Sequence, residues 1–442
     1  MGLRLSYPTG GWAAGRGEPN GVEPMANLIH FIHRFPPAPG GAEFVAQQVC
    51  ARMLESGHRV RVETTNAFSP GAFHQLFSET LQAGSTCLDG IWVRRHRCHR
   101  LPFQRFLLGI TQRLAPSALK PWLNWYSPIC PGLGSGPWTG DFIPEAVVVW
   151  ALPHGSVWAS ALRFAKKLRV PLVAVPLLHP GNPRDPECPI RAAFRKPWIR
   201  QILGQADRVI ALTFWEKNEL SNLGVPPLSI AVAGLGLPPT DVTGGNRSLF
   251  RQGLGISSDA KVIGHMATLS KDKGTLDLLE ARWRVGSSEG PTLVLAGERT
   301  PLVDRQLKKM GKAPWLRVTS HLSLEQKKDF YAGIDLFCLP SFVDSWSLCI
   351  MEAWSVGKGV IVYDAGGPGE LIRHGVDGWK VAPGDIGELA SVLKRVQSDA
   401  DFDLQWGEAG MSRISAEFDW NRAMTRLSNA ILNPIQPGQA SD

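Results

Sequence analysis

The chain has 442 residues, which is too long for a single hydrophobic core, and we expect two domains. Hydrophobic residues make up 44% of it and charged residues 19%, a globular composition that excludes a disordered or fibrous chain. The formal net charge of +8 favours anionic partners such as nucleotide phosphates or acidic lipid, but it is too small and too dispersed to indicate a nucleic-acid-binding protein.

The N-terminal residues and the cysteines indicate where in the cell the protein is expected. Residues 1–24 are rich in Gly and Pro without a strand or helix period, so we expect a disordered leader with Met25 as an alternative start. They lack the apolar segment of a signal peptide, and no apolar run in the chain reaches the roughly 18 residues that cross a bilayer. Seven cysteines without paired spacing indicate reduced thiols and a cytoplasmic protein.

After the leader, the hydrophobic pattern alternates between strands and helices. The first half predicts strands at 28–33, 59–65, 145–150, 170–178 and 207–213, with helices at 44–56 and 156–168. The second half predicts strands at 261–268, 291–297, 336–340 and 360–365, with helices at 275–285 and 325–334. Such alternation predicts α/β domains built on parallel sheets.

A Gly- and Pro-rich break at 234–246 divides this pattern into two Rossmann-like domains that we expect to face a cleft. We place the N-terminal domain at 25–238, the C-terminal domain at 239–420, and a final helix with a tail at 421–442. Residues 92–140 break the alternation and mix Arg and Lys with Trp, Phe and Leu. They form either a patch for an anionic membrane surface or a helical insert whose apolar face packs on the domain.

Several residues lie where such folds bind ligands. The glycine pair that ends at Gly41 separates a strand from a helix, where a phosphate can approach the free N–H groups. Lys271 and Lys273 precede the helix at 275–285, an end that the helix dipole makes unfavourable for cations unless an anion binds there. His154 and His179 follow predicted strands, at the edge where parallel sheets bind ligands. A solvated lysine pair and two structural histidines remain the simpler alternatives.

The stretch VDSWSLCIMEAWSVG at 343–357 places two acids in an apolar segment. The pattern predicts a buried helix from Ser347 to Val356 that ends at Gly357. Asp344 precedes this helix and Glu352 lies within it, eight residues later. Because a buried carboxylate without partners costs several kcal/mol, either the protein pairs Glu352 internally or a polar ligand does so.

Taken together, these segments resemble the retaining glycosyltransferases of family 4, which have the two-domain GT-B fold. In the N-terminal half the resemblance rests on PGGAE (39–43), ESGHRVRVETT (55–65) and ADRVIALT (206–213). In the C-terminal half it rests on SKDKGTLDLLEA (270–281), LVLAGE (293–298), DFYAGIDLFCLPS (329–341) and the stretch from 343 to 385. It covers residues 27–430 and implies an N-terminal acceptor-binding domain, a C-terminal nucleotide-sugar-binding domain and a last helix that crosses back.

The resemblance also implies residue roles. Asp344 and Glu352 match the paired acids of the family's E-x7-E motif. Glu352 would then hold the ribose hydroxyls of a nucleotide, and Asp344 the hydroxyls of the transferred sugar. Lys273 would stabilise negative charge on the departing diphosphate, and His179 would lie beside the sugar. We therefore expect His179, Lys273 and Asp344 to be the catalytic residues.

The diphosphate would face the start of the helix that carries Glu352. By the resemblance, the backbone N–H groups of Ser347, Leu348 and Cys349 would point at it, and Gly41 would approach from the other domain. Lysine, helix dipole and amides replace a metal in this scheme. We therefore expect no metal and no cofactor beyond the UDP- or GDP-sugar co-substrate.

Three departures from the family pattern leave a second function open. Asp344 stands where Glu is usual, Thr268 where many relatives have Arg, and Ser347 where Gly is usual. The expected function is metal-independent transfer of a hexose to a hydroxyl of a glycan or glycolipid, as in polysaccharide biosynthesis, in the cytoplasm or peripherally at a membrane's inner face. The alternatives are a non-catalytic homologue that binds a nucleotide sugar or glycan, and another GT-B enzyme such as a nucleotide-sugar epimerase or a phosphorylase.

Overall fold

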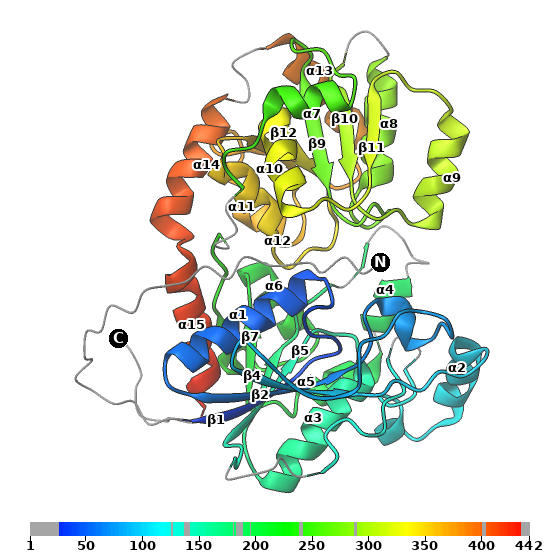
Figure 1. Ribbon diagram of the computed structural model, residues 1–442, viewed down its shortest axis with the longest axis vertical. Helices are drawn as coiled ribbons and strands as arrows, with labels where there is room; N and C mark the ends of the chain where they lie inside the picture. Colours follow the sequence, from blue (N-terminus) through cyan, green and yellow to red (C-terminus); the bar gives the residue numbers. More distant parts are fainter. Residues whose placement is uncertain are drawn as a thin grey trace.

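The computed structural model shows two α/β domains stacked along the long axis of the molecule (Figure 1). It describes residues 26–124, 127–136, 142–179, 181–182, 189–194, 196–237, 242–286, 290–399 and 404–434. The predicted leader at 1–24, the alternative start at Met25 and the predicted domain boundary between 238 and 239 lie outside the described residues.

The N-terminal domain is built on an eight-stranded sheet in the order β3-β4-β2-β1-β5-β6-β7-β8. Neighbouring strands run parallel except for the antiparallel pair of β3 and β4. The strands are β1 (Asn27–Phe31), β2 (Arg59–Thr65), β3 (Gly84–Leu88), β4 (Ile91–His96), β5 (Ala146–Trp150), β6 (Leu172–Val175), β7 (Arg208–Ala211) and β8 (Ile230–Val232). Every residue of β5 is buried, as expected of a central strand covered on both faces.

Helices cover both faces of this sheet and form a hydrophobic core on each side. They are α1 (Gly41–Glu55), α2 (Gln104–Leu114), α3 (Gly155–Leu168), α4 (Pro189–Phe194), α5 (Pro197–Leu203) and α6 (Phe214–Asn222). Residues of α1 pack in one core, and residues of α3 and α5 pack in the other. Short 3-10 turns lie at Pro70–Phe73, Ser117–Leu119 and Pro227–Ser229.

The C-terminal domain is built on a six-stranded parallel sheet in the order β11-β10-β9-β12-β13-β14. Its strands are β9 (Val262–Met266), β10 (Thr292–Ala296), β11 (Leu316–Thr319), β12 (Leu336–Leu339), β13 (Gly359–Tyr363) and β14 (Trp379–Val381). Its helices are α7 (Arg247–Gly253), α8 (Thr275–Val285), α9 (Pro301–Met310), α10 (Leu324–Gly333), α11 (Leu348–Ser355), α12 (Gly366–Leu371), α13 (Ile386–Ser398) and α14 (Leu404–Glu417).

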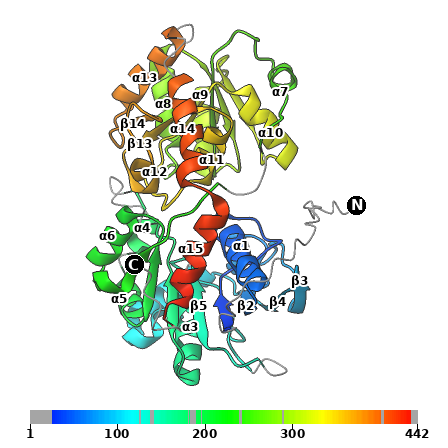
Figure 2. The same cartoon turned by 90° about the vertical axis from the view of Figure 1, so that its left-hand side faces the viewer.

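The last helix, α15 (Trp420–Leu432), returns to the N-terminal domain and packs beside α1 (Figure 2). Its buried side chains, among them Met424, Leu427 and Ile431, join the same core as Val45 and Val49 of α1. The two connections between the domains also run side by side, because the N–H of Leu237 donates to the carbonyl of Phe418 at 2.9 Å. The N-terminal core is therefore completed by residues from the end of the chain.

The predicted pair of Rossmann-like domains is confirmed, with two local corrections. The strand predicted at 170–178 is limited to Leu172–Val175, because the prolines at 171 and 176 have no N–H for the ladder. The segment 92–140 does not break the alternation at its start. Residues 92–96 belong to β4, which pairs with β2 and β3. The arginines at 94 and 95 obscure the alternation of apolar and polar residues that would have predicted this strand.

Candidate active site

Asp344 lies in the loop that leaves β12 and enters α11, and its carboxylate is paired. The side chain is 15% exposed and accepts a hydrogen bond from the ammonium of Lys273. Burial raises the pKa of Asp344, but the charges of Lys273 and His179 and hydrogen bonds from Lys273 and Ser341 outweigh it, so this pKa is lowered. Asp344 is therefore a carboxylate at neutral pH.

Lys273 reaches Asp344 because the loops after β9 and β12 pack backbone against backbone. Gly274 is the N-cap of α8 at φ 70°, and a Cβ there would lie 1.9 Å from the carbonyl oxygen of Pro340. The N–H of Phe342 donates to the carbonyl of Asp272 at 3.0 Å. Only glycine allows this approach, which fixes Lys273 beside the acid.

His179 comes from the other domain, after β6, and meets the same two side chains. The pKa of His179 is lowered to about 4. Burial is the largest cause and the charge of Lys273 acts in the same direction, while Asp344 and a hydrogen bond to the backbone of Val343 act in the opposite direction. The imidazole is therefore neutral at pH 7. The three residues that the sequence analysis expected to be catalytic are thus brought together across the domain boundary.

The segment before His179 is held by Glu216, a residue that the sequence analysis missed. The side chain of Glu216 is fully buried, and its two oxygens accept the N–H groups of Leu178 at 2.6 Å and Leu212 at 2.7 Å. Burial raises the pKa of Glu216 to about 7, although these two hydrogen bonds lower it. An acid in the first turn of a helix gives no signal in the sequence that it reaches a neighbouring loop.

Glu352 has its own partners within the C-terminal domain. It is 2% exposed, and it accepts hydrogen bonds from the ammonium of Lys327 and from the hydroxyl of Tyr331 at 2.8 Å. Burial lowers the pKa of Lys327, but the charge of Glu352 outweighs this and raises it. Of the two alternatives for this carboxylate, the structure thus shows pairing within the protein, by Lys327 and Tyr331 of α10. The expected contact with ribose hydroxyls stays a prediction.

The three residues expected to face a diphosphate form the start of α11. Ser347 is the N-cap, and its side chain makes no capping hydrogen bond to the helix. Leu348 packs against the core of the N-terminal domain, so this turn lies at the boundary between the domains. Burial and then the charge of Glu352 raise the pKa of Cys349 to about 12, which keeps its thiol protonated.

Gly41, which was also expected to face the diphosphate, lies in a different element, the exposed first turn of α1. A Cβ on Gly41 would meet nothing within 4 Å, whereas a Cβ on Gly40 would lie 2.0 Å from Oε2 of Glu43. Glu43 is buried and pairs with Arg34 at 2.6 Å and with His33 at 3.2 Å. The space beneath Gly40 is thus filled by a carboxylate, and the open space lies at Gly41.

The second histidine expected at a strand end is His154. It caps α3, and its ring stacks on that of His33 with centroids 3.9 Å apart. Within the described parts of the chain, no group of three or more His, Cys, Asp or Glu side chains is arranged to hold a metal ion. No described helix combines the length and the apolar character needed to cross a membrane.

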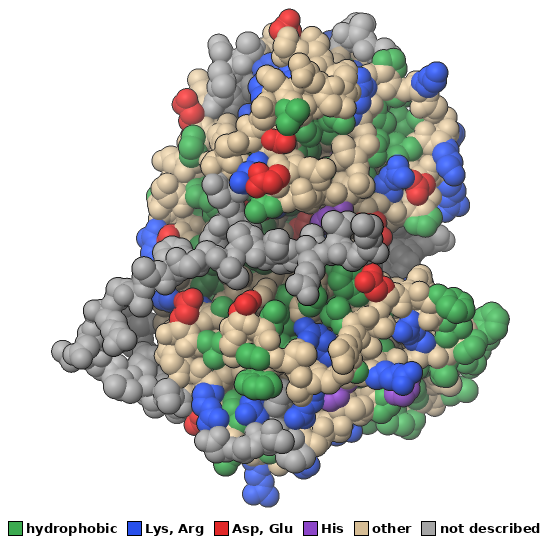
Figure 3. All heavy atoms as spheres, in the orientation of Figure 1, with side chains coloured by type: hydrophobic (Ala, Val, Ile, Leu, Met, Phe, Trp, Pro, Cys, Tyr) green, Lys and Arg blue, Asp and Glu red, His purple; other side chains and the backbone are tan. Residues whose placement is uncertain are grey.

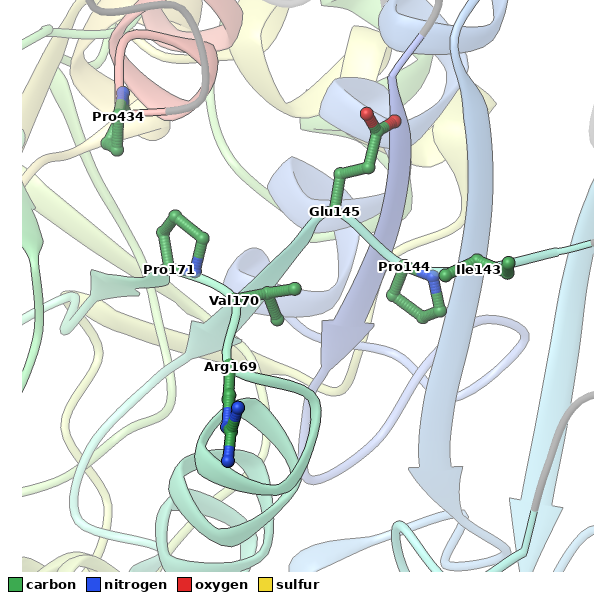
Figure 4. A pocket seen from close by; sticks show the side chains of 7 residues that line it. All are labelled: Ile143, Pro144, Glu145, Arg169, Val170, Pro171 and Pro434. Atoms are coloured by element: carbon green, nitrogen blue, oxygen red, sulfur yellow. The ribbon is translucent and has the colours of Figure 1, made fainter.

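A separate hollow of about 490 Å³ is lined by Ile143, Pro144, Glu145, Arg169, Val170, Pro171 and Pro434 (Figure 4). These residues precede β5 and β6 or end the described chain, so the hollow is at the amino ends of the strands. Open α/β sheets bind ligands at the opposite edge, where His179, Lys273 and Asp344 are found.

The fold and the placement of this cluster define a GT-B protein. Comparison with known families agrees, because the profile of "Glycosyl transferases group 1" matches residues 246–413 and that of "Glycosyl transferase 4-like domain" matches residues 40–236. The chain belongs to this family of GT-B glycosyltransferases, as the sequence resemblance predicted.

Individual relatives are distant. A D-inositol 3-phosphate glycosyltransferase of Geodermatophilus obscurus is 28% identical over 241 residues, which cover 51% of this chain and 52% of that protein. A glycogen synthase of Mycobacterium tuberculosis is 28% identical over 172 residues, which cover 38% and 41%. The chain thus spans about half the length of the curated relatives it matches, or less.

Solved structures match over a larger part of the chain. Anabaena HepE in complex with UDP and glucose has a TM-score of 0.65 at 17% identity and covers 92% of this chain and 99% of its own. Sucrose-phosphate synthase from Thermosynechococcus elongatus has a TM-score of 0.67 at 15% identity and covers 91% and 98%. At these identities the likeness establishes the fold.

Proposed function

We propose that this protein transfers a hexose from a UDP- or GDP-sugar to a hydroxyl of a glycan or glycolipid, with retention of the anomeric configuration. The observation that carries the proposal is the meeting of His179 from one domain with Asp344 and Lys273 from the other. A carboxylate accepts hydrogen bonds from sugar hydroxyls, a neutral imidazole can donate or accept one, and an ammonium binds phosphate. The three together suit a sugar diphosphate held between two domains.

In this proposal, binding of the donor gives Lys273 and Asp344 new partners in place of each other. Lys273 leaves Asp344 for the diphosphate, and Asp344 then receives hydroxyls of the sugar. Glu352 binds the ribose hydroxyls with the lone pairs that Lys327 and Tyr331 leave unused, since a carboxylate accepts about four hydrogen bonds. The N–H groups at the start of α11 and the open turn at Gly41 approach the diphosphate. Anabaena HepE, a protein of this fold, has been solved in complex with UDP-glucose, a ligand of this kind.

The proposed chemistry needs no metal and no protein base. The acceptor oxygen bonds to the anomeric carbon on the face from which the diphosphate leaves, and the bond between that carbon and the diphosphate oxygen breaks. The acceptor's proton passes to the departing diphosphate. Lys273 and the helix amides stabilise the charge that develops on this leaving group, and the neutral His179 is positioned beside the sugar.

We further propose that α2 binds the cytoplasmic face of a membrane and that the protein reaches its acceptor there. This helix buries only Leu108 among its large apolar side chains, together with two glutamines, and exposes the others. Gln104 and Gln112 are buried and donate to the carbonyls of Phe73 and Lys120, each at 2.9 Å. The outward face instead presents large apolar side chains, including Phe106 at 67% and Leu114 at 83% exposed.

The surroundings extend the apolar patch and give it positive charge. Further exposed apolar residues are Leu76, Phe77, Leu101, Phe103, Leu107 and Ile110. Figure 3 shows hydrophobic side chains gathered over α2, with basic side chains beside them. Arg105 and Arg113 are exposed on the same helix, and residues 92–140 contain no Asp or Glu. Apolar side chains beside arginines fit the interface of an anionic bilayer.

The membrane proposal is tested with sedimented vesicles, with and without an anionic lipid. Phe103→Ser combined with Phe106→Ser should abolish binding to the anionic vesicles and leave the protein folded, since both side chains are exposed. Leu228→Ser, which removes an equally exposed apolar side chain elsewhere, should bind as the unchanged protein does. Equal binding by the double variant would exclude α2 as the docking surface.

The transferase proposal is tested by incubating the protein with a panel of nucleotide sugars and detergent-solubilised glycolipids and measuring released nucleoside diphosphate. Release from one donor that depends on an acceptor and is lost in Asp344→Asn would support it. Donor binding without release across the panel would favour the non-catalytic homologue. A new sugar epimer formed without an acceptor would identify an epimerase, and dependence on free phosphate a phosphorylase.

A further inference from the structure

A single acidic side chain links the parts of the two domains that carry the candidate catalytic residues. Glu370 of α12, in the C-terminal domain, accepts the N–H groups of Phe214 at 2.9 Å and Trp215 at 2.6 Å, which begin α6 in the N-terminal domain. Figure 1 shows α12 and α6 adjacent at the boundary. The first N–H groups of a helix have no partner within it, and here the other domain supplies one.

On the C-terminal side, α12 is fixed to the loop that carries Asp344. The N–H of Gly367 donates to the carbonyl of Asp344 at 2.7 Å. A Cβ on Gly366 would lie 2.5 Å from that carbonyl oxygen, and a Cβ on Gly367 would lie 2.3 Å from the carbonyl oxygen of Ser345. Backbone packed this closely cannot slide, so α12 and Asp344 move together.

On the N-terminal side, α6 is fixed to the segment that carries His179. The third residue of α6 is Glu216, whose buried carboxylate accepts the N–H groups of Leu178 and Leu212. Leu178 directly precedes His179. The two hydrogen bonds of Glu370 therefore join one rigid unit that positions Asp344 to another that positions His179.

We propose that Glu370 is a positioning residue, a latch that holds the two domains together with His179 against Asp344. Glu370 is itself exposed, so water can replace its hydrogen bonds when the domains separate. A latch of this kind is suited to a protein whose proposed reaction requires the donor to enter and the products to leave between the domains. Only its catalytic consequence rests on the proposed function, because the link between the domains is independent of turnover.

A variant that weakens the same helix without touching the other domain separates a latch from a simple helix cap. Thr213 caps α6 from within the N-terminal domain, since its Oγ1 accepts the N–H of Glu216 at 3.0 Å. Glu370→Ala and Thr213→Ala thus each remove a cap from one helix end. Only Glu370→Ala removes a contact between domains. Glu370→Gln keeps an acceptor oxygen without the charge.

The experiment compares amide hydrogen exchange and small-angle X-ray scattering of the full chain and these three variants. In Glu370→Ala we expect the amides of Phe214 and Trp215 to exchange about tenfold faster, equivalent to about 1.4 kcal/mol, with a larger radius of gyration. Thr213→Ala should leave the radius unchanged, and Glu370→Gln should fall between. An unchanged radius in Glu370→Ala, even with faster exchange at Phe214 and Trp215, would overturn the proposal.

Where turnover is established, Glu370→Ala should lower kcat and leave the donor KM nearly unchanged, since the donor contacts proposed for the C-terminal domain remain. Glu370→Gln should restore part of kcat. If the unchanged protein shows no turnover, the proposed function fails, whereas the scattering and exchange results still decide the latch. A fall in donor affinity with kcat preserved would contradict the positioning role.

Discussion

The ammonium of Lys273 lies against the carboxylate of Asp344, although one follows β9 and the other follows β12. Neither strand alone carries a site. Their carboxyl ends meet because β9 and β12 are neighbours in the sheet, and His179 reaches the pair from the other domain. The charge of Lys273 lowers the pKa of Asp344, so binding of an anion to Lys273 would release Asp344 for another partner.

Removing the ammonium should affect the chemical step. Lys273→Met keeps the side-chain length and removes the charge proposed to stabilise the leaving diphosphate. We expect kcat to fall by about 10²- to 10³-fold, the typical effect of losing one such group. Steady-state kinetics with the donor that the panel identifies measure this. Lys308→Met, on the exposed side of α9, serves as the control and should retain full activity.

The same variant predicts a pH effect on stability. The pKa of Asp344 is lower in the folded protein than its ordinary value of about 4. Asp344 therefore adds stability above that pH, and this contribution is lost as the pH falls through the folded pKa. Lys273→Met removes the main cause of the lowering. Its deficit in Tm should be largest near neutral pH and shrink in acid, and a deficit independent of pH would contradict this.

Glu216 predicts the opposite pH dependence. Its folded pKa of about 7 lies above the ordinary value of about 4.3. The contribution of Glu216 to the free energy of unfolding is complete below the ordinary pKa and is lost as the pH rises through 7. Glu216→Gln cannot titrate, so the Tm difference between the protein and this variant should decrease between pH 5 and pH 8. Thermal unfolding across that range tests it, and a difference that grows with pH would refute it.

Two glycines with similar positive φ should respond differently to alanine. Gly274 and Gly255 have φ of 70° and 61°, so alanine at either position costs about 1–2 kcal/mol in strain. Only at Gly274 would the new Cβ lie 1.9 Å from the carbonyl oxygen of Pro340, whereas at Gly255 it meets nothing within 4 Å. Gly274→Ala should unfold at lower denaturant concentration and lose activity, because Lys273 is displaced. Equal effects would contradict the close packing of these loops.

The partners of Glu352 can be removed one at a time. Tyr331→Phe removes one hydrogen bond and should cost about 1 kcal/mol. Lys327→Ala leaves a buried carboxylate without its cation and should cost about 1–3 kcal/mol, less than for a fully buried pair because Lys327 is 24% exposed. Urea unfolding measures both losses. A Lys327→Ala variant as stable as the starting protein would show that the pair contributes nothing.

The sequence predicted those parts of the structure that depend on local patterns. Buried parallel strands such as β5 are continuous apolar runs, and the carboxyl end of such strands is where ligands bind, so His179 and Asp344 could be found. The helix from Ser347 to Val356 is observed as Leu348–Ser355, because its apolar pattern and Gly357 mark both ends.

Contacts between distant segments could not be predicted. Lys327 is 25 residues from Glu352, and their meeting depends on how α10 packs on α11. Phe214 and Trp215 are 156 and 155 residues from Glu370 in the chain, and their hydrogen bonds to it depend on how the domains are placed. A charged residue in a sequence shows that a partner is needed, but the partner is chosen by tertiary packing.

The return of α15 to the N-terminal domain has a consequence for biosynthesis. A ribosome completes residues 26–237 long before it adds Met424, Leu427 and Ile431, which fill the same core as Val45 and Val49. Part of the apolar surface of the N-terminal domain therefore stays uncovered until α15 has been synthesised. The C-terminal domain has its own core, formed by residues from 242 onward. During synthesis, the N-terminal domain should therefore complete its folding last, when α15 packs beside α1.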